Sequence, residues 1–133
     1  DKMPQHFHNT TVESILAYMK AQFSYWTEDE TACNFRRMLT LEQYRNPEMA
    51  NLYQKVLASG PVNYIEDLFR EMMRQGTWLE GSPRQMAVEF FAPFYLLLSM
   101  SDAASGKEEK EKVAVLFTTH LECFVETYAA KMP

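Results

Sequence analysis

Apolar residues recur every three to four positions along most of the chain, which is the period of an amphipathic α-helix. No segment alternates apolar and polar residues for long, so the sequence gives no strand signal. The expected fold class is therefore all-α, with about six helices. The predicted helices cover residues 10–26, 28–45, 47–58, 61–75, 83–103 and 107–131.

Residues that favour helix starts stand before these segments. Thr10-Thr11-Val12-Glu13 and Thr27-Glu28-Asp29-Glu30 each match a capping box, in which two side chains satisfy free backbone donors. Asn46-Pro47, Gly60-Pro61 and Ser82-Pro83 each place a proline at the first helical position, where its missing N–H costs nothing. On the second predicted helix, Arg36 and Arg37 are expected nearer solvent than Phe35, Met38 and Leu39.

The last two predicted helices differ from the others because they are apolar on nearly every side. A helix that is apolar all round must be covered all round. A monomer of 133 residues is expected to leave one face of each helix uncovered. Two such helices joined by a short turn make half of a four-helix bundle, and a two-fold homodimer would supply the other half.

Length and charge limit the class of protein. A chain of 133 residues indicates one domain, which we divide into a lead-in segment at 1–9, pocket-forming helices at 10–81 and dimerisation helices at 82–133. The net charge of −5 argues against nucleic-acid binding through the overall field. The longest apolar stretch, 86–100, falls short of the ~20 residues that span a bilayer, so no membrane association is expected.

The aromatic and methionine content suggests a cavity. The chain has 9 Phe, 7 Tyr, 2 Trp and 9 Met, and such residues fill a core or line adaptable pockets for apolar ligands. Buried tyrosine hydroxyls need polar partners, so tyrosines could also frame a cavity. Pro93 removes one helical hydrogen bond, which either gives a tolerated kink or opens space beside Phe90 and Phe94.

Catalytic chemistry is sparse. His120 and Cys123 share a helix face and could form a thiolate–imidazole pair, but no third group or oxyanion hole accompanies them. His6, His8 and Glu13 could hold a metal, and a lead-in segment explains the same residues. Only two cysteines are present, which suits a reducing cytosol. We therefore expect no enzyme activity, no cofactor, no metal and a cytoplasmic location.

Three stretches resemble a known family. They are Phe35-Arg36-Arg37-Met38-Leu39 with Tyr44-Arg45-Asn46-Pro47-Glu48-Met49-Ala50, then Leu68-Phe69-Arg70-Glu71-Met72-Met73-Arg74-Gln75-Gly76, and Glu89-Phe90-Phe91-Ala92-Pro93-Phe94-Tyr95-Leu96-Leu97-Leu98. From about residue 10 to the end, the chain resembles the carboxy-terminal domain of the TetR family of bacterial transcriptional regulators. The third stretch is similar to that family's penultimate helix, including its mid-helix proline.

The resemblance implies a repressor's ligand-sensing and homodimerisation domain that binds DNA only through an amino-terminal helix-turn-helix domain. No helix-turn-helix signature is present, and the start at Asp1 fits a missing amino-terminal part. The alternative is a helical protein–protein interaction module without a ligand cavity. The expected pocket residues, for a small apolar or aromatic ligand, are Met19, Phe23, Trp26, Phe35, Met38, Leu39, Tyr64, Leu68 and Phe94. The expected dimer-interface residues are Phe91, Tyr95, Leu98, Phe117, Leu121, Phe124 and Tyr128.

Overall fold

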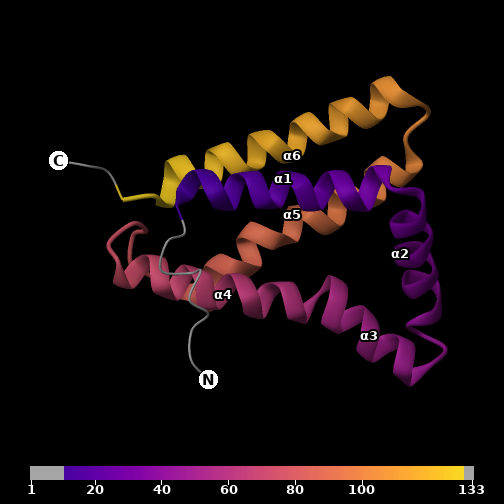
Figure 1. Cartoon of the computed structure of the whole chain (residues 1–133), viewed down its shortest axis with the longest axis horizontal. Helices are drawn as coiled ribbons and strands as arrows, with labels where there is room; N and C mark the ends of the chain where they lie inside the picture. The colour runs from indigo at the N-terminus through magenta and orange to yellow at the C-terminus, as the bar shows by residue number, and fades with distance from the viewer. Residues whose placement is uncertain (1–10, 131–133) are drawn as a thin grey trace.

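The protein is all-α, as predicted: the computed structural model describes residues 11–130, is 83% helical and has no strands in that range. One residue, Ala58, separates the third helix from the fourth. Figure 1 shows the arrangement. The helices are α1 (Val12–Glu28), α2 (Glu30–Glu42), α3 (Pro47–Leu57), α4 (Ser59–Arg74), α5 (Pro83–Ala103) and α6 (Lys107–Tyr128).

Side-chain caps fix several helix starts. The Ser82 hydroxyl accepts a hydrogen bond from the Gln85 N–H at 3.2 Å, as the sequence predicted for α5. The predicted capping boxes of the first two helices are wrong in detail. At the start of α1, Thr11 and Ser14 form the capping box, in place of the predicted pair Thr10 and Glu13. Asp29 caps α2 by accepting from the Ala32 N–H at 2.9 Å.

Helix α5 lies in the middle of the fold, with α4 on one side and α1 and α6 on the other. In Figure 1, α1 and α6 lie side by side, α5 crosses behind them, and α3 and α4 run along the opposite edge. Helix α5 packs on α1, α4 and α6, and α2 joins the end of α1 to α3. The backbones of α1 and α4 do not approach within 8 Å at any Cα pair over these two helices. That separation leaves room between them.

Aromatic rings fill the main core, where α1, α4, α5 and α6 meet. Phe117 of α6 stacks on Phe23 of α1 with ring centroids 4.7 Å apart. Phe69 of α4 lies 5.0 Å from the ring of Trp78. A second, smaller cluster at the α2–α3 end is built on Leu39, Tyr53 and Leu57. The α2–α3 hairpin therefore has a small core of its own.

Five of the seven expected dimer-interface residues are core residues of the single chain, which corrects that expectation. Each of the five is at most 7% exposed, because α1 and α4 cover the faces of α5 and α6 that carry them. A monomer of this length thus buries more of these two helices than the sequence argument allowed. Tyr95 and Tyr128 are half-buried. The five buried residues are Phe91, Leu98, Phe117, Leu121 and Phe124.

Helix α5 is more apolar than the other helices. Among the described residues it is the one helix long and apolar enough to cross a membrane, with a mean hydropathy of 1.2 over its most apolar window. In this fold 44% of that window is buried, and α5 packs between α4 and α6. The helix has the position of a central core helix.

Candidate functional site

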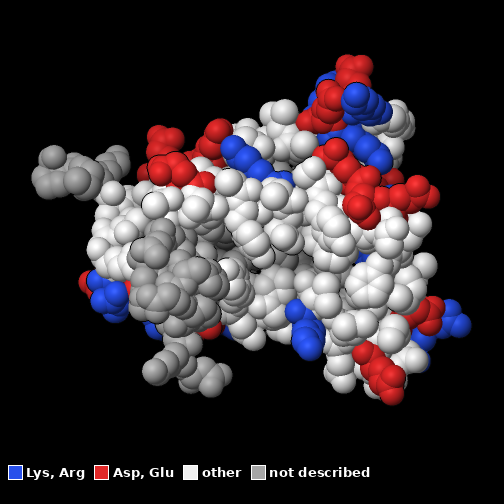
Figure 2. Space-filling view, in the orientation of Figure 1, with Lys and Arg blue, Asp and Glu red and all other residues white. Residues whose placement is uncertain are grey.

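A hollow opens where α1 and α4 stand apart. Its volume is about 340 Å³, and it is bordered by α1, by the α3–α4 junction and by the middle of α5. Figure 2 shows this face as a recessed, largely uncharged surface between α1 and the α3–α4 segment, whereas charged side chains gather at the start of α6. We call this space the α1–α4 hollow.

The walls of the α1–α4 hollow are mainly aromatic and aliphatic. The rings of Tyr18 and Tyr64 face each other across 6.1 Å, one from α1 and one from α4. Burial raises the pKa of Tyr64, and the nearby Tyr18 adds to the shift, so the Tyr64 hydroxyl stays protonated. The lining residues are Tyr18, Met19, Gln22, Trp26, Lys55, Val56, Leu57, Gly60, Pro61, Tyr64, Ile65, Phe91 and Phe94.

The α3–α4 junction shapes one side of this hollow. A Cβ atom at Gly60 would collide with the backbone carbonyl of Lys55, so only glycine allows this close approach. Pro61 has no N–H to donate to a preceding carbonyl. The sequence predicts a helix start at Gly60-Pro61. In the structure this pair lies just inside α4, which begins at Ser59 without a side-chain cap.

Two polar side chains border the hollow beside its tyrosines. Gln22 on α1 is half-buried, and Lys55 at the end of α3 is exposed. No Asp or Glu is among the lining residues. The hollow therefore offers an apolar interior, an amide, two phenol groups and one cation at the rim.

The expected pocket residues divide into three groups. Met19, Trp26, Tyr64 and Phe94 line the α1–α4 hollow. Three others, Phe23, Leu39 and Leu68, are at most 4% exposed and belong to the cores. Phe35 and Met38 are more than one-third exposed on α2 and do not border this hollow, because α2 turns away from it. Tyr18, Gln22 and the residues of the α3–α4 junction border the hollow but were not among the expected pocket residues.

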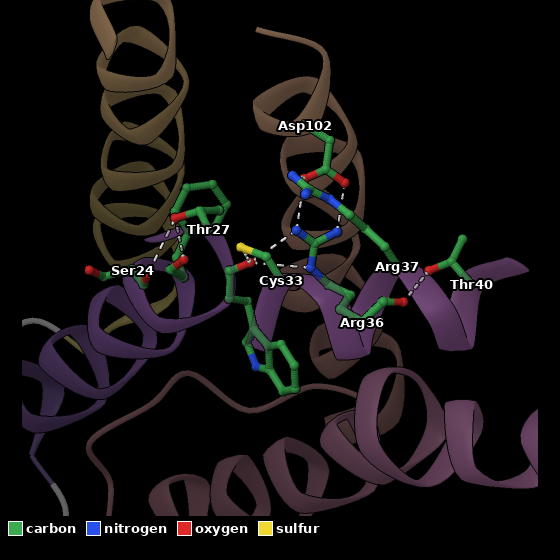
Figure 3. A network of polar contacts seen from close by, with 9 residues as sticks. Ser24, Thr27, Cys33, Arg36, Arg37, Thr40 and Asp102 are labelled. Carbon is green, nitrogen blue, oxygen red and sulfur yellow. Dashed lines mark hydrogen bonds and ion pairs between the residues drawn. The ribbon is translucent and has the colours of Figure 1, made fainter. Parts of the chain in front are cut away.

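Arg36 corrects a second expectation, since it is only 5% exposed. Its guanidinium donates to both carboxylate oxygens of Asp102 at 2.8 Å and to the Trp26 carbonyl at 3.0 and 3.2 Å. Figure 3 shows Arg36 between the end of α1 and the end of α5, with Arg37 reaching the same carboxylate. The backbones of α2 and α5 do not approach within 8 Å at any Cα pair. The side chains of Arg36 and Asp102 therefore bridge the two helices.

The suggested catalytic pair is not joined by a hydrogen bond. A carbonyl oxygen only accepts, so His120 Nε2 donates to the Phe90 carbonyl at 2.9 Å. Cys123 is exposed and free. His6 and His8 lie outside the described residues. Across residues 11–130, no group of three or more His, Cys, Asp or Glu side chains could hold a metal.

A shallow groove runs along the outer surface between α5 and α6. Pro93 and Ala92 border it from α5, and His120 and Cys123 border it from α6. Because residues three and four apart share a helix face, Leu96 and Leu116 lie one turn beyond the groove on the same faces of α5 and α6. Leu96 is 62% and Leu116 is 51% exposed. We call this surface the α5–α6 face.

Comparison of the chain with protein-family models, with curated proteins and with solved structures finds no match. The class of protein defined by fold and site is an all-α protein with an apolar hollow at a helix junction.

Proposed function

We propose that this chain is the small-molecule-sensing and dimerisation domain of a TetR-like bacterial transcriptional regulator that works in the cytoplasm. In this proposal, a ligand binds in the α1–α4 hollow and controls DNA binding by an amino-terminal helix-turn-helix domain outside this chain. The observation that supports it most is the hollow itself. It is apolar and recessed, and three separate parts of the fold border it.

The walls favour an uncharged, flat and mainly apolar ligand. Ligand sites are concave and largely apolar, with a few polar groups that fix orientation. The volume of about 340 Å³ is roughly twice that of an engineered cavity of about 150 Å³ that binds benzene. A ligand of about two rings would fit, stacked beside Tyr18 and Tyr64, with a polar atom near Gln22.

The position of the hollow offers a route from ligand to partner subunit. Phe91 and Phe94 border the hollow from α5, and the same helix carries Leu96 on the α5–α6 face. A ligand that binds better when α1 and α4 are further apart shifts the population towards that arrangement. A coupling of about 1–3 kcal/mol between the ligand and DNA sites is typical of such switches.

A homodimer through the α5–α6 face completes the proposal. The exposed apolar side chains on this part of α5 are Val88, Leu96 and Met100, spaced by multiples of four residues. Leu116 is exposed on α6. Two copies related by a two-fold axis would bring together α5 and α6 from each subunit as four helices. These exposed residues take the place of the buried ones expected from the sequence.

Fluorescence titration with the neutral probe N-phenyl-1-naphthylamine tests ligand binding. We expect saturable binding that weakens by about 5- to 10-fold in Tyr64→Ala, since an aromatic contact contributes about 0.5–1.5 kcal/mol beyond its buried area. Tyr64 is 37% exposed, so the variant should remain folded. Tyr44→Ala, at a tyrosine that is 87% exposed and does not border the hollow, is the matched control.

Two results would contradict ligand sensing in the α1–α4 hollow. One is the absence of saturable binding, which the alternative of a solid interaction module predicts. The other is an equal loss of affinity in Tyr64→Ala and Tyr44→Ala, which would place the probe on a general apolar surface. Circular dichroism of both variants checks that the helices remain.

A further inference from the structure

A second hollow lies on the other side of α3, between α2, α3 and the last turns of α5. Its volume is about 400 Å³. It exists because neither α2 nor α3 has a Cα within 8 Å of one in α5. Only Leu57 borders both hollows, so they are separate spaces. We call this one the α2–α5 hollow.

One wall of the α2–α5 hollow carries an excess positive charge. Two guanidinium groups, those of Arg36 and Arg37, meet the single carboxylate of Asp102, which leaves a net charge of +1. Asp102 accepts three hydrogen bonds of 2.8 to 3.0 Å from them, so its own charge is compensated. A second anion beside this wall would meet an attractive field.

Arg37 is the group with donors to spare. Arg36 directs Nε and both Nη atoms at Trp26 and Asp102. Arg37 directs only Nη2 at Asp102, 3.0 Å away, and its side chain is 45% exposed. Its Nε and Nη1 atoms make no hydrogen bond with the protein groups of residues 11–130. Each of these two N–H-bearing atoms can donate a charge-assisted hydrogen bond to a carboxylate.

The opposite wall is apolar and aromatic. Leu57 and Leu98 are buried beneath it, and Leu41 is 71% exposed at its rim. The rings of Tyr53 and Tyr95 lie 6.0 Å apart and are tilted by 37°. Burial raises the pKa of Tyr95, and a hydrogen bond with Tyr53 adds to it, so this hydroxyl stays neutral. Ser99 also lines the hollow, between Tyr95 and Asp102 in the sequence of α5.

We propose that the α2–α5 hollow is a second binding site, for a small molecule that joins an aromatic body to one carboxylate. The body lies against Tyr53, Tyr95 and Leu98, and the carboxylate accepts hydrogen bonds from Arg37. The site does not depend on a ligand in the α1–α4 hollow. Its occupant is anionic, whereas the α1–α4 hollow suits a neutral one.

A pair of probes that differ only in charge tests this site. 1-Naphthoate and 1-naphthamide have nearly the same shape, and titration of each is followed by the amide shifts of the ¹⁵N-labelled protein. We expect naphthoate to shift the Tyr95 and Ser99 amides saturably and to bind about 10-fold more tightly than naphthamide. In Arg37→Gln, naphthoate should weaken by about 10-fold, while naphthamide binding stays within about twofold.

The control variant is Arg45→Gln, which removes the same charge from a side chain that is 76% exposed and does not border the hollow. Naphthoate affinity unchanged in this variant supports the proposal. An equal loss in Arg45→Gln and Arg37→Gln overturns it, as does naphthoate that shifts Gln22 and Tyr64 instead of Tyr95 and Ser99. Failure here leaves N-phenyl-1-naphthylamine binding in the α1–α4 hollow intact, so the two proposals fail separately.

Discussion

Replacing Phe117 with alanine should lower the free energy of unfolding by about 3–5 kcal/mol, the usual cost of removing a buried phenylalanine. Phe117 is 1% exposed, stacks on Phe23 at 4.7 Å and meets the edge of Phe94 at 5.5 Å. The substitution would leave a cavity between α1, α5 and α6, because Phe117 of α6 contacts rings from both other helices. Urea denaturation followed by circular dichroism measures it.

The dependence on protein concentration separates a core role from an interface role. If Phe117 lies in the core of one chain, the loss is the same at low and high protein concentration. A decrease in the free energy of unfolding that appears only at concentrations where subunits associate would instead place Phe117 in an interface. That result would contradict the fold described above. Leu41→Ala is the control: its side chain is 71% exposed, so we expect a change within about 0.5 kcal/mol.

Replacing Asp102 with alanine should lower the free energy of unfolding by about 3 kcal/mol. The substitution leaves Arg36, which is 5% exposed, as a buried charge without its carboxylate partner, and breaking such a pair costs about 3–5 kcal/mol. The Asp102 side chain is 28% exposed, so in the variant water can solvate part of the unpaired Arg36 charge. We therefore expect the lower end of that range of energies. Asp67→Ala, which breaks an exposed pair with Arg70, should cost at most about 1 kcal/mol.

The effect of Asp102→Ala should depend on pH. Burial alone raises the pKa of Asp102, but the hydrogen bonds from Arg36 and Arg37 outweigh it and hold the pKa below its ordinary value. A carboxyl group whose pKa is lower in the folded chain stabilises the fold at pH values above its pKa in the unfolded chain, about 3.9. This stabilisation is lost as the pH falls through the pKa of the folded chain. The free energies of unfolding of wild type and variant should therefore differ by the full amount at pH 7. The difference should shrink as the pH falls below about 4. A constant difference would contradict the ion-pair explanation.

The fold class was predictable because local signals are strong in this chain. Ser82-Pro83 marked the start of α5 at the correct residue, and Asn46-Pro47 did so for α3. The period of the apolar residues then predicted the helical segments between these starts. The period does not show whether an apolar helix face is covered by the same chain or by a second subunit. For this reason residues of α5 and α6 that are buried within one chain were expected at a dimer interface.

The candidate sites depend on distances between helices that are remote in sequence. The α1–α4 hollow requires α1 and α4 to stand apart, and Met19 and Tyr64 reach it from opposite sides. No local pattern distinguishes such a Met19 from a core methionine. Arg36 was expected near solvent because its partner Asp102 is 66 residues away. Only the folded chain brings that pair together.

Sedimentation equilibrium on the wild-type chain and on Leu96→Glu tests the central claim, a sensor domain that dimerises through the α5–α6 face. The proposal predicts a wild-type mass of twice 15.6 kDa at micromolar concentration. It predicts a folded monomer for Leu96→Glu, whose side chain is 62% exposed, and a dimer for the control Leu41→Glu on α2. A wild-type mass of 15.6 kDa, or a Leu96→Glu protein that still dimerises, would contradict it.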